Sequence, residues 1–258
     1  MSLILNQGLA SQYTFPSGFS IDAPPWAKRL NELERAYKHG AAITGDEMVK
    51  ARPLRVWGVL YRTTRTLFQS ALDDMERACY LKGSAFHATD HWTDRYLTVD
   101  CANFSIDYLV TLFAADVDIL FRVVDPFWYS DTLSSHVQSG TSSGGLGPAP
   151  NNTGPIEVSP TIFIYVATGT ITAIDLVNHS DLSRTFNWTG NLTVGRGIRI
   201  RCAQGQIHRW TGTAWVDGLS GFDGTFYRLQ PGENHIVLTL TGVGTVDITH
   251  QWRTKWLG

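Results

Sequence analysis

Two histidines are the first candidates for chemistry in this sequence. His87 and His91 stand four residues apart in H-A-T-D-H, and on a helix that spacing would place both imidazoles on one face, where they could share a metal ion. Gly83 precedes them as a helix-ending signal, no third ligand follows at a suitable spacing, and the H-E-x-x-H pattern is absent. We therefore expect a turn between strands here, and no metal site.

Catalytic motifs are equally weak. The sequence has no G-x-S-x-G elbow for a serine nucleophile, and its carboxylates are scattered. Asp217 and Asp223 could form a glycosidase pair, but each precedes a glycine in an ordinary turn dipeptide. The Gly-rich segment near residue 140 lacks the lysine of a phosphate-binding loop. We expect no catalytic residue, no cofactor and no enzyme, and we keep a glycan hydrolase as the least favoured alternative.

Aromatic residues offer a third kind of chemistry. Trp210, Trp215, Phe222 and Tyr227 are interleaved with glycines in the last quarter of the chain. Exposed aromatic rings can stack on sugar rings, so Trp210 and Trp215 are candidates for a saccharide platform. Alternation along strands would bury about half of these side chains, so packing in and around a β core is the competing interpretation.

Composition limits the classes of function. The chain has 258 residues, a net charge of −2 and a pI near 6.4, with no basic tail or stripe, which argues against binding nucleic acid through its phosphates. The first residues lack the positive region of a signal peptide, and no apolar run reaches the ~18 residues of a membrane span. Three isolated cysteines, Cys79, Cys101 and Cys202, fit folding in a reducing cytoplasm.

The segment from Arg52 to Asp125 predicts an α+β unit. Residues 52–61 alternate as a strand does, and then Phe68, Leu72, Met75 and Cys79 recur at helical spacing. Thr66 is the predicted N-cap of this helix, and Gly83 is the predicted residue that follows its C-terminus. Alternation returns in residues 96–101 and 117–123, so we expect an antiparallel sheet with one helix on one face.

Aromatic residues at strand ends suggest how this unit is used. Pro126 should stop a strand, and Phe127, Trp128 and Tyr129 follow it directly. These rings either pack under the next segment or lie at a subunit contact, where Trp and Tyr are enriched. Together with Trp57 they are the predicted oligomer interface.

Composition also predicts domain boundaries. Residues 1–132 are expected to form the N-terminal domain, which begins with an extended arm. Residues 133–155, rich in Gly, Ser and Pro, are expected to be a linker or long surface loop. Residues 156–258 contain short β-rich runs separated by turns at roughly 8–12-residue intervals, as in a β-sandwich. The predicted fold class is mainly β.

The order of these elements resembles a known family. The run from Ala36 to Gly58, the helix, and V-D-P-F-W-Y-S-D from Val124 resemble the distal tail protein of long-tailed (siphovirus-type) bacteriophages. The L-x-P-G-x-N-x-I run from Leu229 to Ile236 and the closing strand resemble that family's galectin-like or carbohydrate-module-like β-sandwich. The resemblance covers essentially the whole chain and also implies strands in residues 27–50.

The resemblance implies a structural virion protein. Identical copies, six by resemblance, would close head-to-tail into a ring at the distal end of the tail tube and leave a channel for DNA. It implies contacts with the tail tube protein, the tape measure protein, the tail hub and receptor-binding proteins. The protein would be assembled in the bacterial host cytoplasm, without a membrane anchor and without specific nucleic-acid binding. A carbohydrate-binding module that aids host adsorption is the main alternative.

Overall fold

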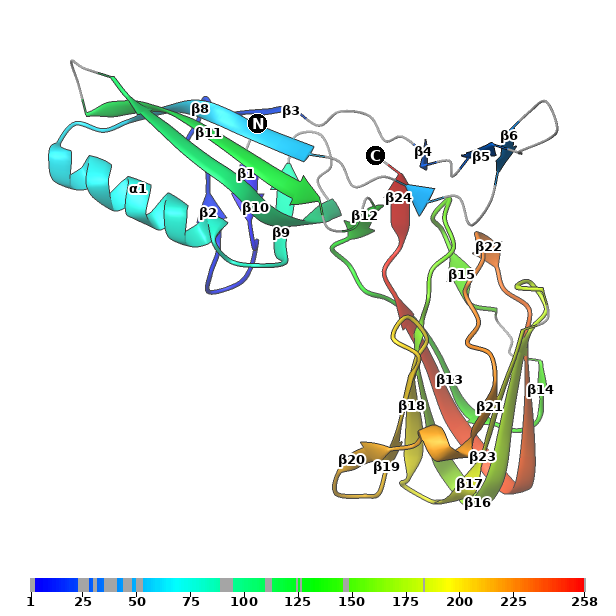
Figure 1. Ribbon diagram of the computed structural model, residues 1–258. Coiled ribbons are helices and arrows are strands. Elements are labelled where there is room, and N and C mark those ends of the chain that lie inside the picture. Colours follow the sequence, from blue (N-terminus) through cyan, green and yellow to red (C-terminus); the bar gives the residue numbers. More distant parts are fainter. Residues whose placement is uncertain are drawn as a thin grey trace. The chain divides into compact units, whose positions relative to one another are not determined.

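The computed structural model describes residues 3–22, 28–29, 32–34, 41–43, 48–49, 53–88, 95–109, 113–123, 125, 127–145, 149–182 and 184–257. The chain divides into two compact units (Figure 1). The first unit contains Met1–Asp131 and Leu257–Gly258, and the second contains Thr132–Trp256. Each unit is described below by itself.

The first unit is built on an antiparallel sheet with the strand order β2-β1-β9-β10-β11-β8-β3. β12 pairs with β10 and with β24. Two further short pairs, β4 with β7 and β5 with β6, fall in the 27–50 region where the family resemblance implied strands. The strands are β1 (Leu3–Leu5), β2 (Tyr13–Thr14), β3 (Ser20–Asp22), β4 (Lys28–Arg29), β5 (Glu32–Glu34), β6 (Ala41–Ile43), β7 (Met48–Val49), β8 (Pro53–Tyr61), β9 (Ser84–Ala88), β10 (Arg95–Tyr108), β11 (Ala114–Val123), β12 (Phe127–Ser130) and β24 (Lys255–Leu257).

Helix α1 (Arg65–Cys79) lies along one side of this sheet (Figure 1). The predicted apolar stripe is confirmed, because Phe68, Leu72, Met75 and Cys79 are all buried. The helix packs against β10 and β2, and the Phe68 ring lies 6.2 Å from the Tyr108 ring of β10.

Both predicted ends of the helix need correction. The N-cap is Thr64, not Thr66, because the Thr64 hydroxyl accepts the Leu67 N–H at 3.3 Å while Thr66 already lies in the first turn. The C-cap is Tyr80. Gly83, with φ +65°, serves the turn into β9, where its N–H donates to Asp100 Oδ1 at 2.7 Å.

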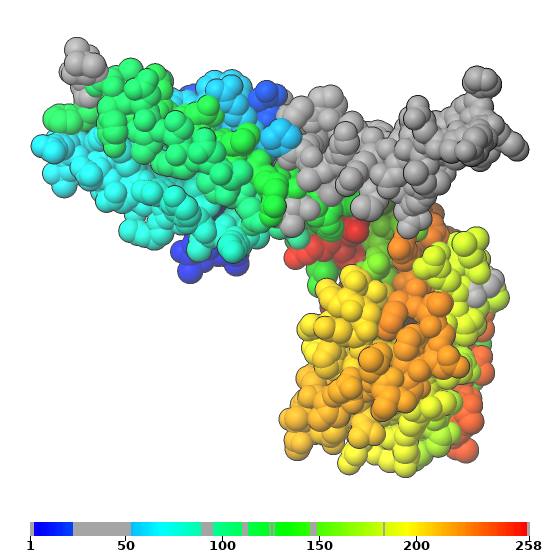
Figure 2. Space-filling view, viewed as in Figure 1, coloured from blue at the N-terminus to red at the C-terminus, as the bar shows by residue number. Residues whose placement is uncertain are grey.

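The second unit consists almost entirely of antiparallel strands. Two of them, β16 and β23, pair along nearly their whole length and form the central strand pair of the unit. The elements are β13 (Ser134–Thr141), β14 (Gly144–Gly145), β15 (Asn151–Asn152), β16 (Thr161–Asn178), β17 (Arg184–Thr193), β18 (Gly197–Arg201), β19 (Gln206–Trp210), β20 (Trp215–Asp217), the 3-10 helix η1 (Leu219–Gly221), β21 (Phe222–Gly224), β22 (Gly232–Glu233) and β23 (Ile236–Trp252). Figure 2 shows the segment from β19 to β22, gold to orange, spread over the visible face of this unit.

The two long strands bend sharply in the middle and so belong to two layers. The first half of β16 pairs with β18 and its second half pairs with β17, yet buried residues from both halves, such as Ile164 and Ile174, share one hydrophobic cluster. The bend contains Gly169, Gly242 and Gly244, all with positive φ, and a Cβ at any of them would lie within 2.3 Å of a backbone oxygen of the paired strand. Glycine is therefore required at these positions, because only glycine lets β16 and β23 bend while they stay paired.

Two sequence predictions about this unit are wrong. The predicted runs on either side of Gly169 are one continuous strand, because the glycine bends the chain and does not end it. The segment 133–155 is not simply a linker, since β13 pairs with the second half of β23 from Ser134 onward. Ser134, Ser135, Gly144 and Gly145 of this segment all pair with β23. The prediction of a mainly-β fold with a single helix in the first unit's sheet is confirmed.

Candidate functional site

One candidate surface is the face of the first unit's sheet formed by the outward side chains of β8, β10 and β11. In β8, Leu54, Val56 and Leu60 are fully buried, and the residues between them point outward. Three of these outward residues are apolar and 38–50% exposed: Trp57, Val59 and Tyr61. Half-buried strands normally present polar residues on their free face, so this apolar row makes the face a candidate contact surface.

Charged groups surround this apolar row. Arg55 forms a two-pronged ion pair with Asp118 of β11, with N–O distances of 2.9 and 2.7 Å, and its guanidinium lies 5.4 Å from the centre of the Trp57 ring. The hydrogen bonds from Arg55 lower the pKa of Asp118. The pair holds Trp57 in a fixed orientation on the sheet.

A shallow depression of about 290 Å³ lies in the same face, and we call it the outer-face depression. Asp107 and Asp116 stand directly opposite each other across β10 and β11, and no ion pair of either carboxylate occurs in the described part of the chain. Like charges in directly opposed positions destabilise a sheet unless a counter-charge meets them. The arrangement suits a partner that brings apolar area and positive charge. The depression is lined chiefly by Arg55, Trp57, Val59, Asp107, Asp116 and Asp118.

The four predicted interface aromatics do not lie together on this face. Only Trp57 belongs to it, while Phe127, Trp128 and Tyr129 form β12 beside β10. Trp128 is fully buried, so it contributes to the packing of its own chain and offers no surface to another subunit. Phe127 and Tyr129 are only partly buried, so their place at a subunit contact stays a prediction.

Tyr129 is likewise tied to its own unit. Its ring stacks on Tyr96 with centroids 5.8 Å apart, and its hydroxyl donates a hydrogen bond to Asp125. Burial, and then the hydrogen bond to the Asp125 carboxylate, raise the pKa of Tyr129 well above its ordinary range. The hydroxyl is therefore a permanent hydrogen-bond donor, and the segment after Val123 is anchored by it.

Of the two histidines considered as metal ligands, only His87 lies within the described residues. His87 lies in strand β9, where Nδ1 is 3.3 Å from Asp131 Oδ2, and His91 lies outside the described residues. Burial lowers the pKa of His87, and the Asp131 carboxylate opposes that effect. Among the described residues, no group of three His, Cys, Asp or Glu side chains is arranged to hold a metal ion.

The two carboxylates considered for glycoside hydrolysis lie on strands that do not pair with each other. Asp217 ends β20, where its Oδ1 accepts the Leu219 N–H at 3.1 Å and so forms the turn into η1. Asp223 lies in β21 opposite Asn187 of β17. Asp217 therefore has the local turn role that the Asp-Gly dipeptide predicted.

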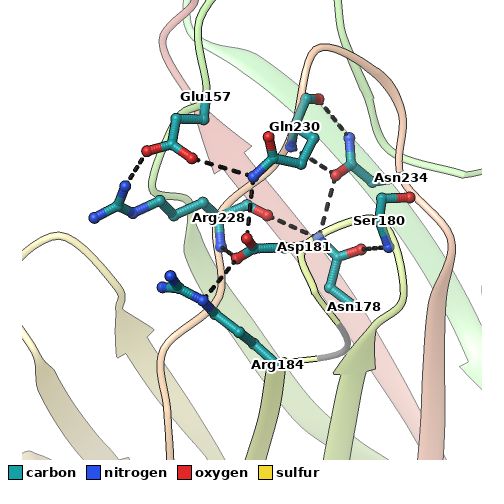
Figure 3. Close-up of polar contacts among 8 residues, drawn as sticks. All are labelled: Glu157, Asn178, Ser180, Asp181, Arg184, Arg228, Gln230 and Asn234. Atoms are coloured by element: carbon teal, nitrogen blue, oxygen red, sulfur yellow. Dashed lines mark hydrogen bonds and ion pairs between the residues drawn. The ribbon is translucent and has the colours of Figure 1, made fainter. Parts of the chain in front are cut away.

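Sequence reasoning missed the densest polar cluster in the second unit, which Figure 3 shows. Asp181, only 3% exposed, accepts the Arg228 N–H at 2.8 Å and the Gln230 side-chain amide at 3.0 Å, and Arg184 Nε lies 3.6 Å away. The same Gln230 amide donates to Glu157 at 3.1 Å. The Asp181 and Glu157 carboxylates already accept hydrogen bonds from the protein itself. The cluster therefore connects loops of this unit and is not a candidate for proton transfer.

Buried amides extend the cluster. Asn234 is fully buried, and its side chain donates to the Gln230 and Gly232 carbonyls at 2.8 and 3.0 Å and accepts the Gln230 N–H at 2.8 Å. Asn178 bonds both Asn234 Oδ1 and the Arg228 carbonyl. The two partners of Asn178 are 50 and 56 residues away in the sequence, so no local pattern could have paired them.

The predicted saccharide residues divide into two groups. Trp210 and Trp215 are partly exposed neighbours on β19 and β20, with ring centres 5.4 Å apart. Tyr227 is buried and Phe222 packs against the hydrophobic cluster, so neither belongs to a surface platform. Alternation therefore buried one part of the aromatic cluster and exposed the other.

Comparisons with solved structures identify the fold. Phage SPP1 Dit, described as a paradigm of the hub adsorption apparatus in phages that infect Gram-positive bacteria, matches with a TM-score of 0.72 at 15% identity and covers 99% of both chains. A chain of the phage P2 baseplate in its activated conformation matches with a TM-score of 0.55 at 11% identity, covering 99% of this chain and 98% of that one. No family model and no curated protein sequence matches. The chain thus has the distal-tail-protein fold from end to end, as its sequence led us to expect.

Proposed function

We propose that this chain is a structural subunit of a phage tail tip. The observation that supports the proposal is the end-to-end similarity to SPP1 Dit, which includes both units in the same order. Copies of the chain close head-to-tail into a ring, a hexamer, at the distal end of the tail tube and leave a channel through which DNA passes. The protein acts through its shape and its contacts, and it breaks no bond.

The outer-face depression is our candidate for one side of the joint between neighbouring copies. A head-to-tail ring needs two different patches on each subunit, and a joint of ordinary size buries about 800 Å² per partner. Trp57, Val59 and Tyr61 supply apolar area at the centre of this patch, and Asp107 and Asp116 supply charge at its rim. The opposing patch then carries basic side chains.

Other partners follow from the same proposal. The ring contacts the tail tube protein, the tape measure protein, the tail hub and receptor-binding proteins, and it is assembled in the host cytoplasm and carried in the virion. Its net charge of −2 suits a channel in which DNA slides without binding. Within the described residues, no helix is long and apolar enough to cross a membrane.

The mass of the full chain in solution tests the proposal. Native mass spectrometry, supported by electron microscopy, should find a closed hexamer of the 28.7 kDa chain. Val59→Asp places a third carboxylate beside Asp107 and Asp116 and should shift the population toward monomers. Val243→Asp is the matched control, because Val243 is 85% exposed in the second unit.

Two results would contradict this account. A wild-type chain that stays monomeric at high concentration and is absent from phage tails would refute the ring. A ring that tolerates Val59→Asp as well as it tolerates Val243→Asp would place the joint on another face of the molecule.

A further inference from the structure

The second unit carries a row of aromatic rings on the outward face of its larger sheet. Strands β16, β18, β19 and β20 lie side by side there (Figure 1), and Tyr165, Gly197, Trp210 and Trp215 stand opposite one another in that order. The Trp215 ring centre lies 6.2 Å from Tyr165 and 5.4 Å from Trp210. The rings thus form one continuous aromatic surface.

Gly197 makes this surface possible. A Cβ at Gly197 would lie 2.7 Å from Cδ1 of Tyr165 and 2.3 Å from the Ile164 carbonyl oxygen. Because glycine has no side chain, the Tyr165 ring can lie flat over β18 and approach Trp215. Any larger residue at this position would separate the two halves of the row.

Two arginines point outward from β18 beside the rings. The Arg199 guanidinium lies 4.7 Å from the centre of the Trp215 ring, and its buried Nε has no hydrogen-bond partner in the described chain. Arg201 follows two residues later and therefore faces the same side of the sheet. Neither arginine forms an ion pair with a carboxylate in the described part of the protein.

This pair of charges is uncompensated. Burial, and then the nearby positive charge of Arg201, lower the pKa of Arg199. His208 stands opposite Arg199 on β19, and its buried Nδ1 likewise lacks a hydrogen-bond partner among the described residues. An anionic, acceptor-rich ligand would neutralise the arginine pair.

We infer that this aromatic–arginine face, formed by Tyr165, Arg199, Arg201, His208, Trp210 and Trp215, is a binding site for an anionic saccharide. A sugar ring stacks on the tryptophans, and its carboxylate or phosphate substituent is held by Arg199 and Arg201. The hydroxyl groups of the sugar take up the remaining hydrogen bonds. This goes beyond the structural role proposed above, since it gives the second unit a ligand of its own.

A single-stranded nucleic acid is the competing ligand for aromatic rings beside arginines. The geometry disfavours it, because Trp210 and Trp215 contact each other at 50° and leave no parallel slot for a base. The net charge of −2 also disfavours a nucleic-acid backbone.

Calorimetric titration of the full chain tests the site. The probes are phosphomannan and the same mannan after its phosphate has been removed, together with trigalacturonate as a carboxylate-bearing saccharide. We expect at least one anionic probe to bind, and the neutral mannan to bind more weakly than phosphomannan. Arg199→Gln should weaken anionic binding about tenfold by removing a charge-assisted contact. Trp215→Ala should abolish measurable binding, and Val243→Ala, at a position that is 85% exposed in the same unit, is the control.

Several outcomes would overturn the inference. The first is that neither anionic probe binds. The second is that Arg199→Gln and Trp215→Ala both bind as the wild type does. The third is that an oligothymidylate binds more tightly than the saccharides. Since Arg199 is a surface residue, its variant remains informative if Trp215→Ala unfolds. Binding is measured per chain, so it can fail or succeed whether or not the chain forms a ring.

Discussion

Acid should destabilise the second unit through one buried histidine. His250 of β23 is fully buried, its Nε2 shares a hydrogen bond of 2.7 Å with the Tyr227 hydroxyl, and His136 stands opposite it on β13. Burial, and then the neighbouring His136, lower the pKa of His250 from 6.5 to about 3. A proton on this imidazole would place an uncompensated charge inside the hydrophobic core.

The size of the effect follows from linkage between protonation and folding. Below pH 6.5 the unfolded chain binds a proton at His250 that the folded chain refuses until about pH 3, so stability falls as the pH falls through this range and is fully present above it. At pH 4.5 the free energy of unfolding should be lower by about 2.7 kcal/mol than at neutral pH. That is a large fraction of the ~5–15 kcal/mol that stabilises a typical domain.

Urea unfolding at a series of pH values measures this loss. Tryptophan fluorescence gives the transition, and pulsed hydrogen exchange of β23 peptides assigns it to the second unit. His250→Gln should lower stability at neutral pH, because an amide replaces the imidazole in a packed site, but it should flatten the slope between pH 6 and 4 by about 1.4 kcal/mol per pH unit. His235→Gln removes an imidazole from an exposed position and tests whether loss of any histidine has this effect.

The reasoning would be refuted by a wild-type stability that is constant between pH 7 and 4.5. It would also fail if His250→Gln kept the full wild-type slope.

Three further predictions test the fold, and two of them include a control variant. Gly169→Ala should destabilise the second unit by well over the ~1–2 kcal/mol of backbone strain, because the new methyl group meets a backbone oxygen, whereas Gly195→Ala has a similar φ and open space and should cost only the strain. Thr64→Ala should lower the free energy of unfolding of the first unit by about 1 kcal/mol through loss of the N-cap, and Thr66→Ala by less. Asn234→Ala leaves buried backbone groups unpaired and should cost about 2–3 kcal/mol. Urea midpoints compared with the wild type measure all three.

The periodic spacing of apolar residues correctly predicted individual helices and strands. The stripe of Phe68, Leu72 and Met75 defined α1, and alternation defined β8 and β11, because each pattern reports which side of one element is buried. Gly169 was misread as a turn because a turn and a bend both use positive φ. What distinguishes them is the pair of glycines in β23, which lie more than seventy residues away in the sequence.

The candidate sites were predictable only in part for a related reason. Trp57 was chosen as an aromatic near a strand end, and Trp210 and Trp215 as aromatics interleaved with glycines. The structure places all three on outward sheet faces, but the strand-end rule also selected Trp128, which is fully buried. Residue type near a strand end does not reveal which face of the sheet the next strand will cover. That depends on long-range pairing, such as that of β12 with β10.

The two candidate surfaces carry opposite charge, and this makes one alternative testable. Asp107 and Asp116 of one copy could meet Arg199 and Arg201 of the next, in which case the arginines would be part of the joint and not of a ligand site. Arg199→Gln separates the two possibilities, because it should disrupt the ring in the first case and only saccharide binding in the second. The stacking of Arg199 on Trp215 favours the second, since an arginine held against its own tryptophan is ordered before any partner arrives. Arg55 is held in the same way over Trp57, but Asp118 already neutralises its charge. Arg55 therefore has no need of an external anion, whereas Arg199 can still bind one.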